Sequence, residues 1–189
     1  MTFKRILITL FISCSTLTVS AADVTSAMVT HVNGVYKVSF EVSINADPQR
    51  VREVVTDYDN LHALSGTVVS SKVLTRDGGR TRLDLVLRPC VWRIFCRTIR
   101  KVTDATVAKD GGILHRTIAS ESDFSFAEEH LTIHAGPENQ GTRARYDAEL
   151  VPKFFVPPLI GPWLVRRQII NDLTETANAV ERVAADPAN

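Results

Sequence analysis

Two segments of the chain alternate strictly between apolar and polar residues. In 36–44 the apolar positions are Tyr36, Val38, Phe40, Val42 and Ile44. In 143–150 they are Ala144, Tyr146, Ala148 and Leu150, and every residue between them is charged. Alternation with a period of two is typical of a strand with one buried face. We therefore predict strands over 36–44 and 143–150.

Between these two segments, further strand signals are separated by turn residues. We predict strands over 68–75, 81–87, 97–107, 113–119 and 125–134. The turns are expected at 77–79, 109–112 and 137–141, which are rich in Asp, Gly and Asn. Their order along the chain predicts an antiparallel sheet.

Helical signals flank this run of strands. Asp47 and Pro48 suit the N-cap and the first turn of a short helix, and 57–61 indicates a second short helix or a turn. A long final helix is predicted from Pro162 to Ala184. Its expected apolar stripe is Trp163, Ile170, Leu173, Ala177, Val180 and Ala184. Because a curved sheet must bury one face and this helix is the only large cover, the chain predicts an α+β fold.

The segment 150–163 joins the last strand to this helix. It contains four prolines, Pro152, Pro157, Pro158 and Pro162, and almost no polar side chains. Since proline lacks a donor N–H and fixes φ, the segment is neither a central strand nor a continuous helix. Such an apolar connector, hereafter the elbow, must pack on a core, a ligand or a membrane surface.

The N-terminus has the order of a secretory signal peptide. Lys4 and Arg5 precede the apolar run 6–12, and small residues end at Ala21 and Ala22. We predict a signal peptide over 1–22, cleaved near Ala21 or Ala22, and one exported domain over 23–189, periplasmic or secreted. A buried N-terminal strand is the alternative. Lipidation at Cys14 is disfavoured by the residues before it.

If residues 1–22 are removed on export, both the net charge and the set of cysteines in the mature chain change. Without residues 1–22 the chain keeps 20 Lys and Arg against 21 Asp and Glu, a balance that argues against a nucleic-acid partner. Only Cys90 and Cys96 then remain. On one extended strand they would lie about 20 Å apart, so they can pair only if the chain turns between them. We predict this disulfide, with two separate buried thiols as the alternative.

Two stretches of the sequence resemble one family. The first is 40–74, with Ala46-Asp47-Pro48, Val51 and Asp57-Tyr58-Asp59-Asn60-Leu61, and the second runs from Gly141-Thr142 through Tyr146 and Val156-Pro157-Pro158 into the final helix. Together they resemble the START-like (SRPBCC) polyketide cyclase/dehydrase and coenzyme Q-binding family. Relatives often carry a tryptophan in the strand before the final turn, where this chain has Glu128-Glu129-His130-Leu131.

The resemblance implies a helix-grip fold, START/Bet v 1-like, with an apolar tunnel between the sheet and the C-terminal helix. In relatives such tunnels accommodate lipids, isoprenoid quinones, sterols or polyketides. Combining this resemblance with the predicted signal peptide, we expect an exported, monomeric, non-catalytic carrier of a lipid or isoprenoid, with transient contact to a membrane surface. The alternative is a cyclase- or aromatase-like enzyme, because the fold serves both roles.

Apolar and aromatic positions carry the binding hypothesis. If the predicted strand faces are right, six side chains point into the space between sheet and helix: Leu85, Leu87, Phe124, Phe126, Tyr146 and Trp163. Trp92 and Phe95 would lie on the loop closed by the disulfide, beside a pocket or a membrane. An ordinary filled core is the alternative for each of them.

Catalytic and metal-binding patterns are weak. Ser120 and Ser122 lie in no nucleophile elbow, and His130 and His134 would lie about 13 Å apart on a strand. Asp57 and Asp59 suit a turn better than a carboxylate pair. Arg166 and Arg167 suit solvated positions better than a ligand headgroup. We expect no catalytic residue, metal site or cofactor.

Overall fold

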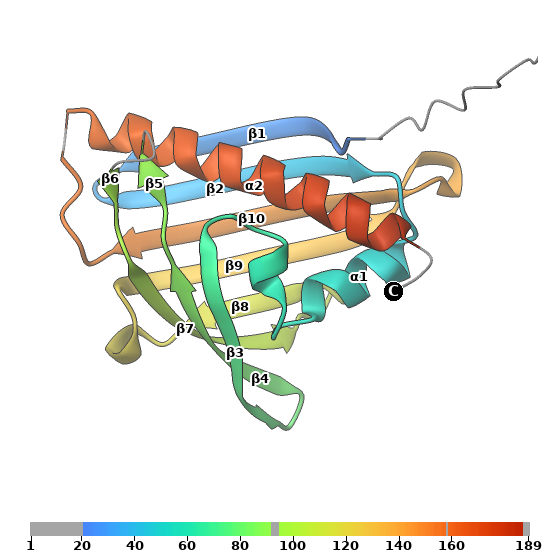
Figure 1. Ribbon diagram of the computed structural model, residues 1–189, viewed down its shortest axis with the longest axis horizontal. Coiled ribbons are helices and arrows are strands. Elements are labelled where there is room, and N and C mark those ends of the chain that lie inside the picture. Colours follow the sequence, from blue (N-terminus) through green and yellow to red (C-terminus); the bar gives the residue numbers. More distant parts are fainter. Residues whose placement is uncertain (1–20, 92–94, 158, 187–189) are drawn as a thin grey trace, which may run out of the picture.

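An eight-stranded antiparallel sheet curls around one long helix (Figure 1). The computed structural model describes residues 21–91, 95–157 and 159–186. Within them the order of the sheet is β1-β2-β10-β9-β8-β7-β4-β3. Its strands are β1 (Asp23–Val32), β2 (Val35–Ile44), β3 (Val68–Asp77), β4 (Arg80–Leu87), β7 (Ile99–Val107), β8 (Ile113–Thr117), β9 (Phe124–Ala135) and β10 (Thr142–Pro152). The short strands β5 (Cys90–Val91) and β6 (Phe95–Cys96) form a separate hairpin.

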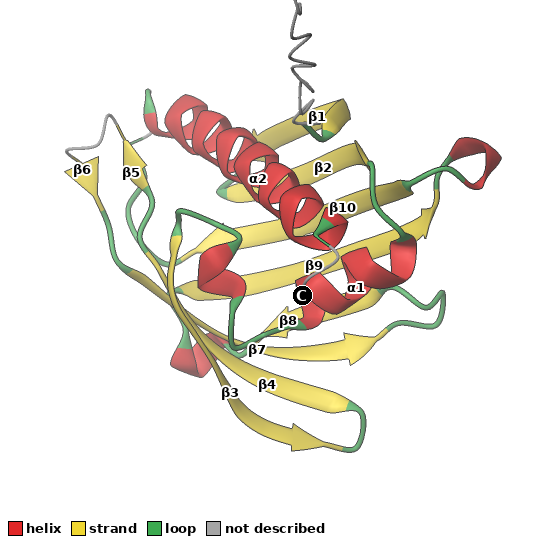
Figure 2. Cartoon of the chain, turned by 45° about the vertical axis from the view of Figure 1, so that its right-hand side comes forward, coloured by secondary structure: helices red, strands yellow, loops and turns green. Residues whose placement is uncertain are grey.

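The helices cover the concave face of the sheet (Figure 2). The long helix is α2 (Gly161–Ala185), and α1 (Pro48–Thr56) lies near its C-terminal end. Three single turns complete the fold: η1 (Leu61–Ala63), η2 (Ala119–Glu121) and η3 (Pro137–Asn139). This is the predicted α+β helix-grip architecture.

Local sequence signals explain how both helices begin. The Asp47 carboxylate accepts hydrogen bonds from the backbone N–H groups of Gln49 and Arg50, at 2.8 and 3.3 Å, and caps α1 as predicted. Pro162 lies in the first turn of α2. At its other end, α2 is tied to the sheet because the buried Glu181 accepts from the Asn45 N–H at 2.9 Å.

The alternation of apolar and polar residues along the strands determines which side chains form the core. In β2 the five predicted apolar positions are all buried: Tyr36, Val38, Phe40, Val42 and Ile44. Val51, Val54, Ala177 and Val180 from the helices pack against the same face. The sequence analysis missed β1, which pairs with β2 at the edge of the sheet. Only one residue of β1, Val29, is buried, so its hydrophobic pattern is faint.

Candidate ligand-binding site

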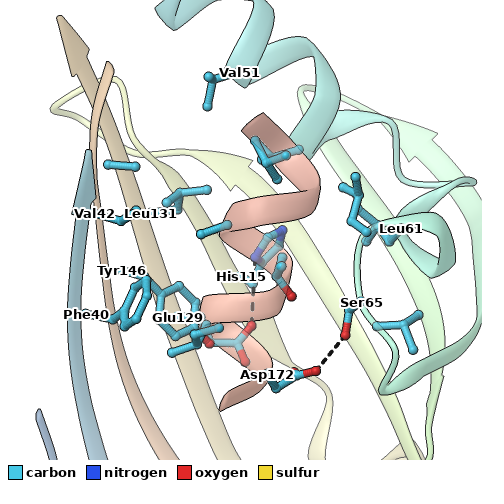
Figure 3. Close-up of a pocket in the computed structure, with 18 of the residues that line it drawn as sticks. Phe40, Val42, Val51, Leu61, Ser65, His115, Glu129, Leu131, Tyr146 and Asp172 are labelled. Carbon is cyan, nitrogen blue, oxygen red and sulfur yellow. Dashed lines mark hydrogen bonds and ion pairs between the residues drawn. The ribbon is translucent and has the colours of Figure 1, made fainter. Parts of the chain in front are cut away.

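Two adjacent cavities lie between the sheet and α2. The first, which we call the α1 chamber, encloses about 260 Å³ beneath α1 and η1 (Figure 3). Its wall is mainly apolar side chains of strands and helices, among them Phe40, Val42, Val51, Leu61, Leu85 and Leu131. These positions face inward because each strand turns alternate residues to the concave side.

The second cavity, which we call the elbow chamber, encloses about 350 Å³. Its wall combines Tyr36, Leu87, Phe124 and Leu150 from the sheet with Leu164, Val165 and Ile169 from the first turns of α2. The elbow residues Pro152, Phe154, Phe155, Val156 and Pro157 complete it. The proline-rich segment therefore packs over an open cavity as well as over apolar side chains.

Four polar side chains line both chambers and lie where the two meet. We call this set the polar belt: Lys101 from β7, Glu129 from β9, Tyr146 from β10 and Asp172 from α2. Lys101 Nζ donates to Glu129 Oε1 at 2.5 Å, and both side chains are about nine-tenths buried, at 7% and 12% exposed. The Asp172 carboxylate accepts from Ser65 Oγ at 2.8 Å.

Mutual contacts set the charges of the belt. Burial by itself raises the pKa of Glu129, but the nearby Lys101 ammonium and the hydrogen bonds from Lys101 and Tyr146 outweigh it and lower that pKa. Burial, followed by the adjacent Glu129 carboxylate, raises the pKa of Tyr146 well above its usual value. The belt therefore holds a charged Lys101–Glu129 pair and a protonated Tyr146.

His115 stands beside the belt in the α1 chamber. Its Nδ1 lies 3.8 Å from Glu129 Oε2, and its ring meets the Tyr58 ring edge-on with centroids 6.0 Å apart. Burial lowers the pKa of His115 to about 4, so the ring is neutral at neutral pH. Figure 3 shows one ring nitrogen facing Glu129 and the other turned away from it.

This arrangement can bind an apolar molecule that carries a polar group. The acid and base candidates, Glu129 and Lys101, neutralise each other. Within the described ranges, no group of three or more His, Cys, Asp or Glu could hold a metal ion.

Four of the predicted site residues point into the chambers. Leu85 lines the α1 chamber, Leu87 and Phe124 line the elbow chamber, and Tyr146 lines both. The predicted inward faces of β4 and β10 are thus right at these positions. Their part in ligand binding stays a prediction.

The inward orientation predicted for Phe126 is wrong. Phe126 lies on the outer face of the sheet and is 46% exposed. The cause is a β-bulge at Ser125, since Val151 pairs with Phe126 while Pro152 pairs with Phe124. The extra residue shifts the alternation, so that Phe124 and Ala127 face inward and Phe126 faces out.

The inward orientation predicted for Trp163 is also wrong. Trp163 is 55% exposed and lies with Arg166 and Arg167 on the outer side of α2. Because Trp163, Leu164 and Val165 are all apolar, the first turn leaves the buried face ambiguous. The structure turns Leu164 and Val165 to the elbow chamber. The Arg167 guanidinium lies 5.7 Å from the Trp163 ring, outside the tunnel.

The predicted disulfide is present. Cys90 and Cys96 are directly opposite each other in the β5–β6 hairpin, with an S–S distance of 2.06 Å. The hairpin lies beside the first turns of α2 (Figures 1 and 2). Pro89 and Arg97, which flank it, line the elbow chamber. Trp92 and the side chain of Phe95 lie outside the described residues, so their predicted role is untested.

The outer end of the elbow chamber carries exposed apolar side chains. Phe155 is 78% exposed and Leu159 is 95% exposed, and Ile160 and Trp163 are more than half exposed. Phe154 is partly buried, and the Arg97 guanidinium lies 4.5 Å from its ring centroid. Apolar surface thus continues from the chamber wall onto the exterior of the protein.

The sequence analysis missed Lys101, His115, Glu129 and Asp172. The signal for two of them was available in the alternation. Ile99, Lys101, Thr103 and Ala105 share one face of β7, and Ala127, Glu129, Leu131 and Ile133 share one face of β9. A charged residue at an apolar position of a strand marks an inward-facing polar group.

The fold and the site define a class. A curved sheet gripping one long helix around an apolar tunnel is the helix-grip fold of START-like and Bet v 1-like proteins. Residues 36–184 match the family described as "Polyketide cyclase / dehydrase and lipid transport". The chain belongs to this family, as its sequence resemblance predicted. A search among curated protein sequences gave no match.

Solved structures with the same fold come from several bacteria. A START superfamily protein from Mycobacterium smegmatis is 21% identical, with a TM-score of 0.62 over 78% of this chain and 96% of that one. The ZhuI aromatase/cyclase from Streptomyces sp. R1128 is 12% identical, with a TM-score of 0.67 over 82% and 96%. A STAR-related lipid transfer protein from Xanthomonas axonopodis is 15% identical, with a TM-score of 0.59 over 85% and 99%. At these identities the likeness shows the fold.

Proposed function

We propose that this protein is an exported carrier that shelters a lipid- or isoprenoid-like ligand between its sheet and α2, without catalysing a reaction. The observation that carries the proposal is the pair of adjacent chambers, about 260 and 350 Å³, with apolar walls. Together they fall in the range of small-molecule sites, about 300–1,000 Å³. Burial of the ligand would contribute about 25 cal/mol for each Å² of apolar area.

Export is supported by two independent features. Residues 1–22 have the order of a signal peptide, and β1 begins at Asp23, directly after the predicted cleavage position. The Cys90–Cys96 disulfide suits an oxidising compartment. Among the described helices, none combines the length and apolar character needed to span a membrane. The carrier would act as a monomer.

The exposed residues at the elbow support ligand exchange at a membrane surface. Phe155, Leu159, Ile160 and Trp163 form what we call the elbow patch, and Arg166 and Arg167 lie beside Trp163. Aromatic side chains favour the boundary between headgroups and acyl chains, and arginines are attracted to anionic lipids. Because Phe155 also lines the elbow chamber, a ligand entering there need not cross bulk water.

A filling substitution tests the carrier directly. Ile169 lines the elbow chamber, and Ile169→Trp would occupy part of it. We expect the fluorescent neutral probe N-phenyl-1-naphthylamine to bind the native protein and to bind this variant at least about tenfold more weakly. The matched control is Ile170→Trp, next along α2 and lining the outer depression with Trp163. Equal probe affinity in all three proteins would contradict the proposal.

A cyclase- or aromatase-like enzyme is the second candidate function. The observation that favours it is the hydrogen bond from Tyr146 to Glu129 in the belt, which aims a phenol at the tunnel. An enzyme that uses this phenol would lose turnover of a polyketide substrate in Tyr146→Phe while keeping affinity. A carrier would show no turnover in either protein.

A further inference from the structure

The α1 chamber has hydrogen-bonding groups that the protein itself does not satisfy. Among the described residues, Nε2 of His115 and Oγ1 of Thr103 are buried and have no partner, and both side chains line this chamber. Buried polar atoms in native structures are almost always hydrogen-bonded, so an orphan needs an explanation. A ligand group or a trapped water supplies the missing partner.

The two orphan atoms lie on neighbouring strands. His115 pairs with Ala105 across β8 and β7, and Thr103 is two residues before Ala105 on the same face. Such diagonal neighbours lie about 7–8 Å apart between their Cα atoms, which one small polar group between the side chains can bridge. Both side chains therefore lie on adjacent strands in the wall of the same chamber.

The donor and acceptor roles follow from the contacts. The Nδ1 of His115 lies 3.8 Å from the Glu129 carboxylate, which favours the neutral tautomer with its proton on Nδ1 and leaves Nε2 as an acceptor. The Thr103 hydroxyl can both donate and accept. A ligand hydroxyl matches this pair, because it can donate to Nε2 and accept from Thr103.

The charges of the belt act against an anionic ligand. Where the two chambers meet, the belt combines one ammonium, that of Lys101, with two carboxylates, those of Glu129 and Asp172. Lys101 is already paired with Glu129 at 2.5 Å, which leaves the Asp172 charge without a cation among the described residues of the belt. A carboxylate or phosphate passing this point would lose its hydration and meet net negative charge.

Building on the proposed carrier function, we propose that the tunnel selects an uncharged hydrophobic alcohol. Its hydroxyl is held in the α1 chamber by His115 Nε2 and Thr103 Oγ1, and its apolar tail extends past the belt into the elbow chamber. The ligand thus enters with its hydroxyl first. Ionised fatty acids and phospholipid headgroups are excluded from the α1 chamber.

Matched twelve-carbon probes test this selection. Displacement of N-phenyl-1-naphthylamine is measured with 1-dodecanol, dodecyl methyl ether and ionised dodecanoate. We expect 1-dodecanol to bind at least about tenfold more tightly than the other two, because only it satisfies both orphan atoms without charge. The nearly isosteric Thr103→Val and the variant His115→Leu should each remove most of this preference and leave ether binding unchanged.

Tyr36→Phe is the matched control, because the Tyr36 hydroxyl is the orphan atom that lines the elbow chamber. It should keep the alcohol preference. If Tyr36→Phe alone removes the preference, the hydroxyl lies in the elbow chamber and the proposed placement is overturned. Dodecanoate binding as tightly as the alcohol, with its carboxylate outside at Arg97, would also overturn it.

The remaining outcomes separate this inference from the carrier function. If all three probes bind alike and no variant changes their order, the orphan atoms are satisfied only by trapped water, so the inference fails while the carrier stands. If neither N-phenyl-1-naphthylamine nor any twelve-carbon probe binds, both the carrier and the inference fail.

Discussion

The two chambers of the tunnel are lined by different kinds of structure. The α1 chamber is enclosed by regular strands and helices and contains His115, Thr103 and the charged pair at its boundary. The elbow chamber is lined in part by an irregular proline-rich segment, which contributes the exposed Phe155, and by Pro89 and Arg97, which flank the disulfide hairpin. Regular elements hold polar groups in fixed positions, whereas a connector tolerates exposure and movement. On the proposed function, the α1 chamber would serve recognition of the ligand and the elbow chamber would serve its access.

Of the substitutions that we propose, breaking the Lys101–Glu129 pair between the chambers should reduce the unfolding free energy the most. Lys101→Met leaves Glu129 buried without its cation, and we expect a loss of about 3–5 kcal/mol in unfolding free energy. The double variant Lys101→Met, Glu129→Leu should recover most of that loss, since no charge is left unpaired. Urea denaturation of the native protein and of both variants measures the effect.

A loss below about 1 kcal/mol for Lys101→Met would contradict a buried, tightly coupled pair. Lys37→Met is the control, because Lys37 pairs with Glu149 on the exposed face of the sheet, with side chains 65% and 43% exposed. That substitution should change stability by less than about 1 kcal/mol.

His115 should make stability depend on pH in a defined window. Its pKa is about 4 in the folded protein and 6.5 ordinarily, because burial disfavours the charged ring. Between these values the unfolded chain binds a proton that the folded chain does not, so stability falls as pH falls from 6.5 to 4. The expected contribution is about 3 kcal/mol at most.

His115→Gln removes this titration and should flatten the pH profile of the unfolding free energy in that window. The pKa of Glu129 is lowered from 4.5, so its own contribution is intact above that value and is lost as pH falls through it, which overlaps only the acidic end of this window. Parallel profiles for the native protein and His115→Gln between pH 6.5 and 4 would show that the ring is solvated and not part of a buried site.

The elbow patch should give a smaller effect, confined to membrane binding. The double variant Phe155→Ala, Trp163→Ala removes two exposed rings, and we expect about tenfold weaker binding to vesicles of phosphatidylcholine with phosphatidylglycerol. Unfolding free energy should change by less than about 0.5 kcal/mol, because both side chains are mainly solvated. Vesicle co-sedimentation measures the binding.

Phe126→Ala is the matched control, since Phe126 is exposed on the outer face of the sheet and is not part of the elbow patch. It should leave vesicle binding unchanged. If it weakens binding as much as the double variant does, the membrane contact is not located at the elbow.

Much of the architecture was predictable because its signals are local and periodic. Alternation gave β2 and β10, Asp47-Pro48 gave the start of α1, and the paired cysteines gave the hairpin. One error arose where a single residue changes the phase of the alternation. The bulge at Ser125 turned Phe126 outward, and a one-residue insertion in a strand leaves no trace in composition.

The site was harder to predict because its residues come from four separate elements. Lys101, Glu129, Tyr146 and Asp172 meet only when β7, β9, β10 and α2 are assembled. Tyr146 was found because it occupies an inward position of a clean strand. Lys101 and Glu129 occupy equivalent positions, but a charge there looks like an outward residue until its partner is known.

The central claim is that an apolar molecule occupies the tunnel. It is tested most directly by native mass spectrometry and solvent extraction of the protein purified from its native cells, from the compartment to which we propose that it is exported. The carrier predicts a bound, uncharged hydrophobic compound at about one per protein, absent from Ile169→Trp and retained in Ile170→Trp. Protein that carries no extractable compound, and that binds no hydrophobic probe, would contradict the account and indicate a tunnel that serves only as a loosely packed core.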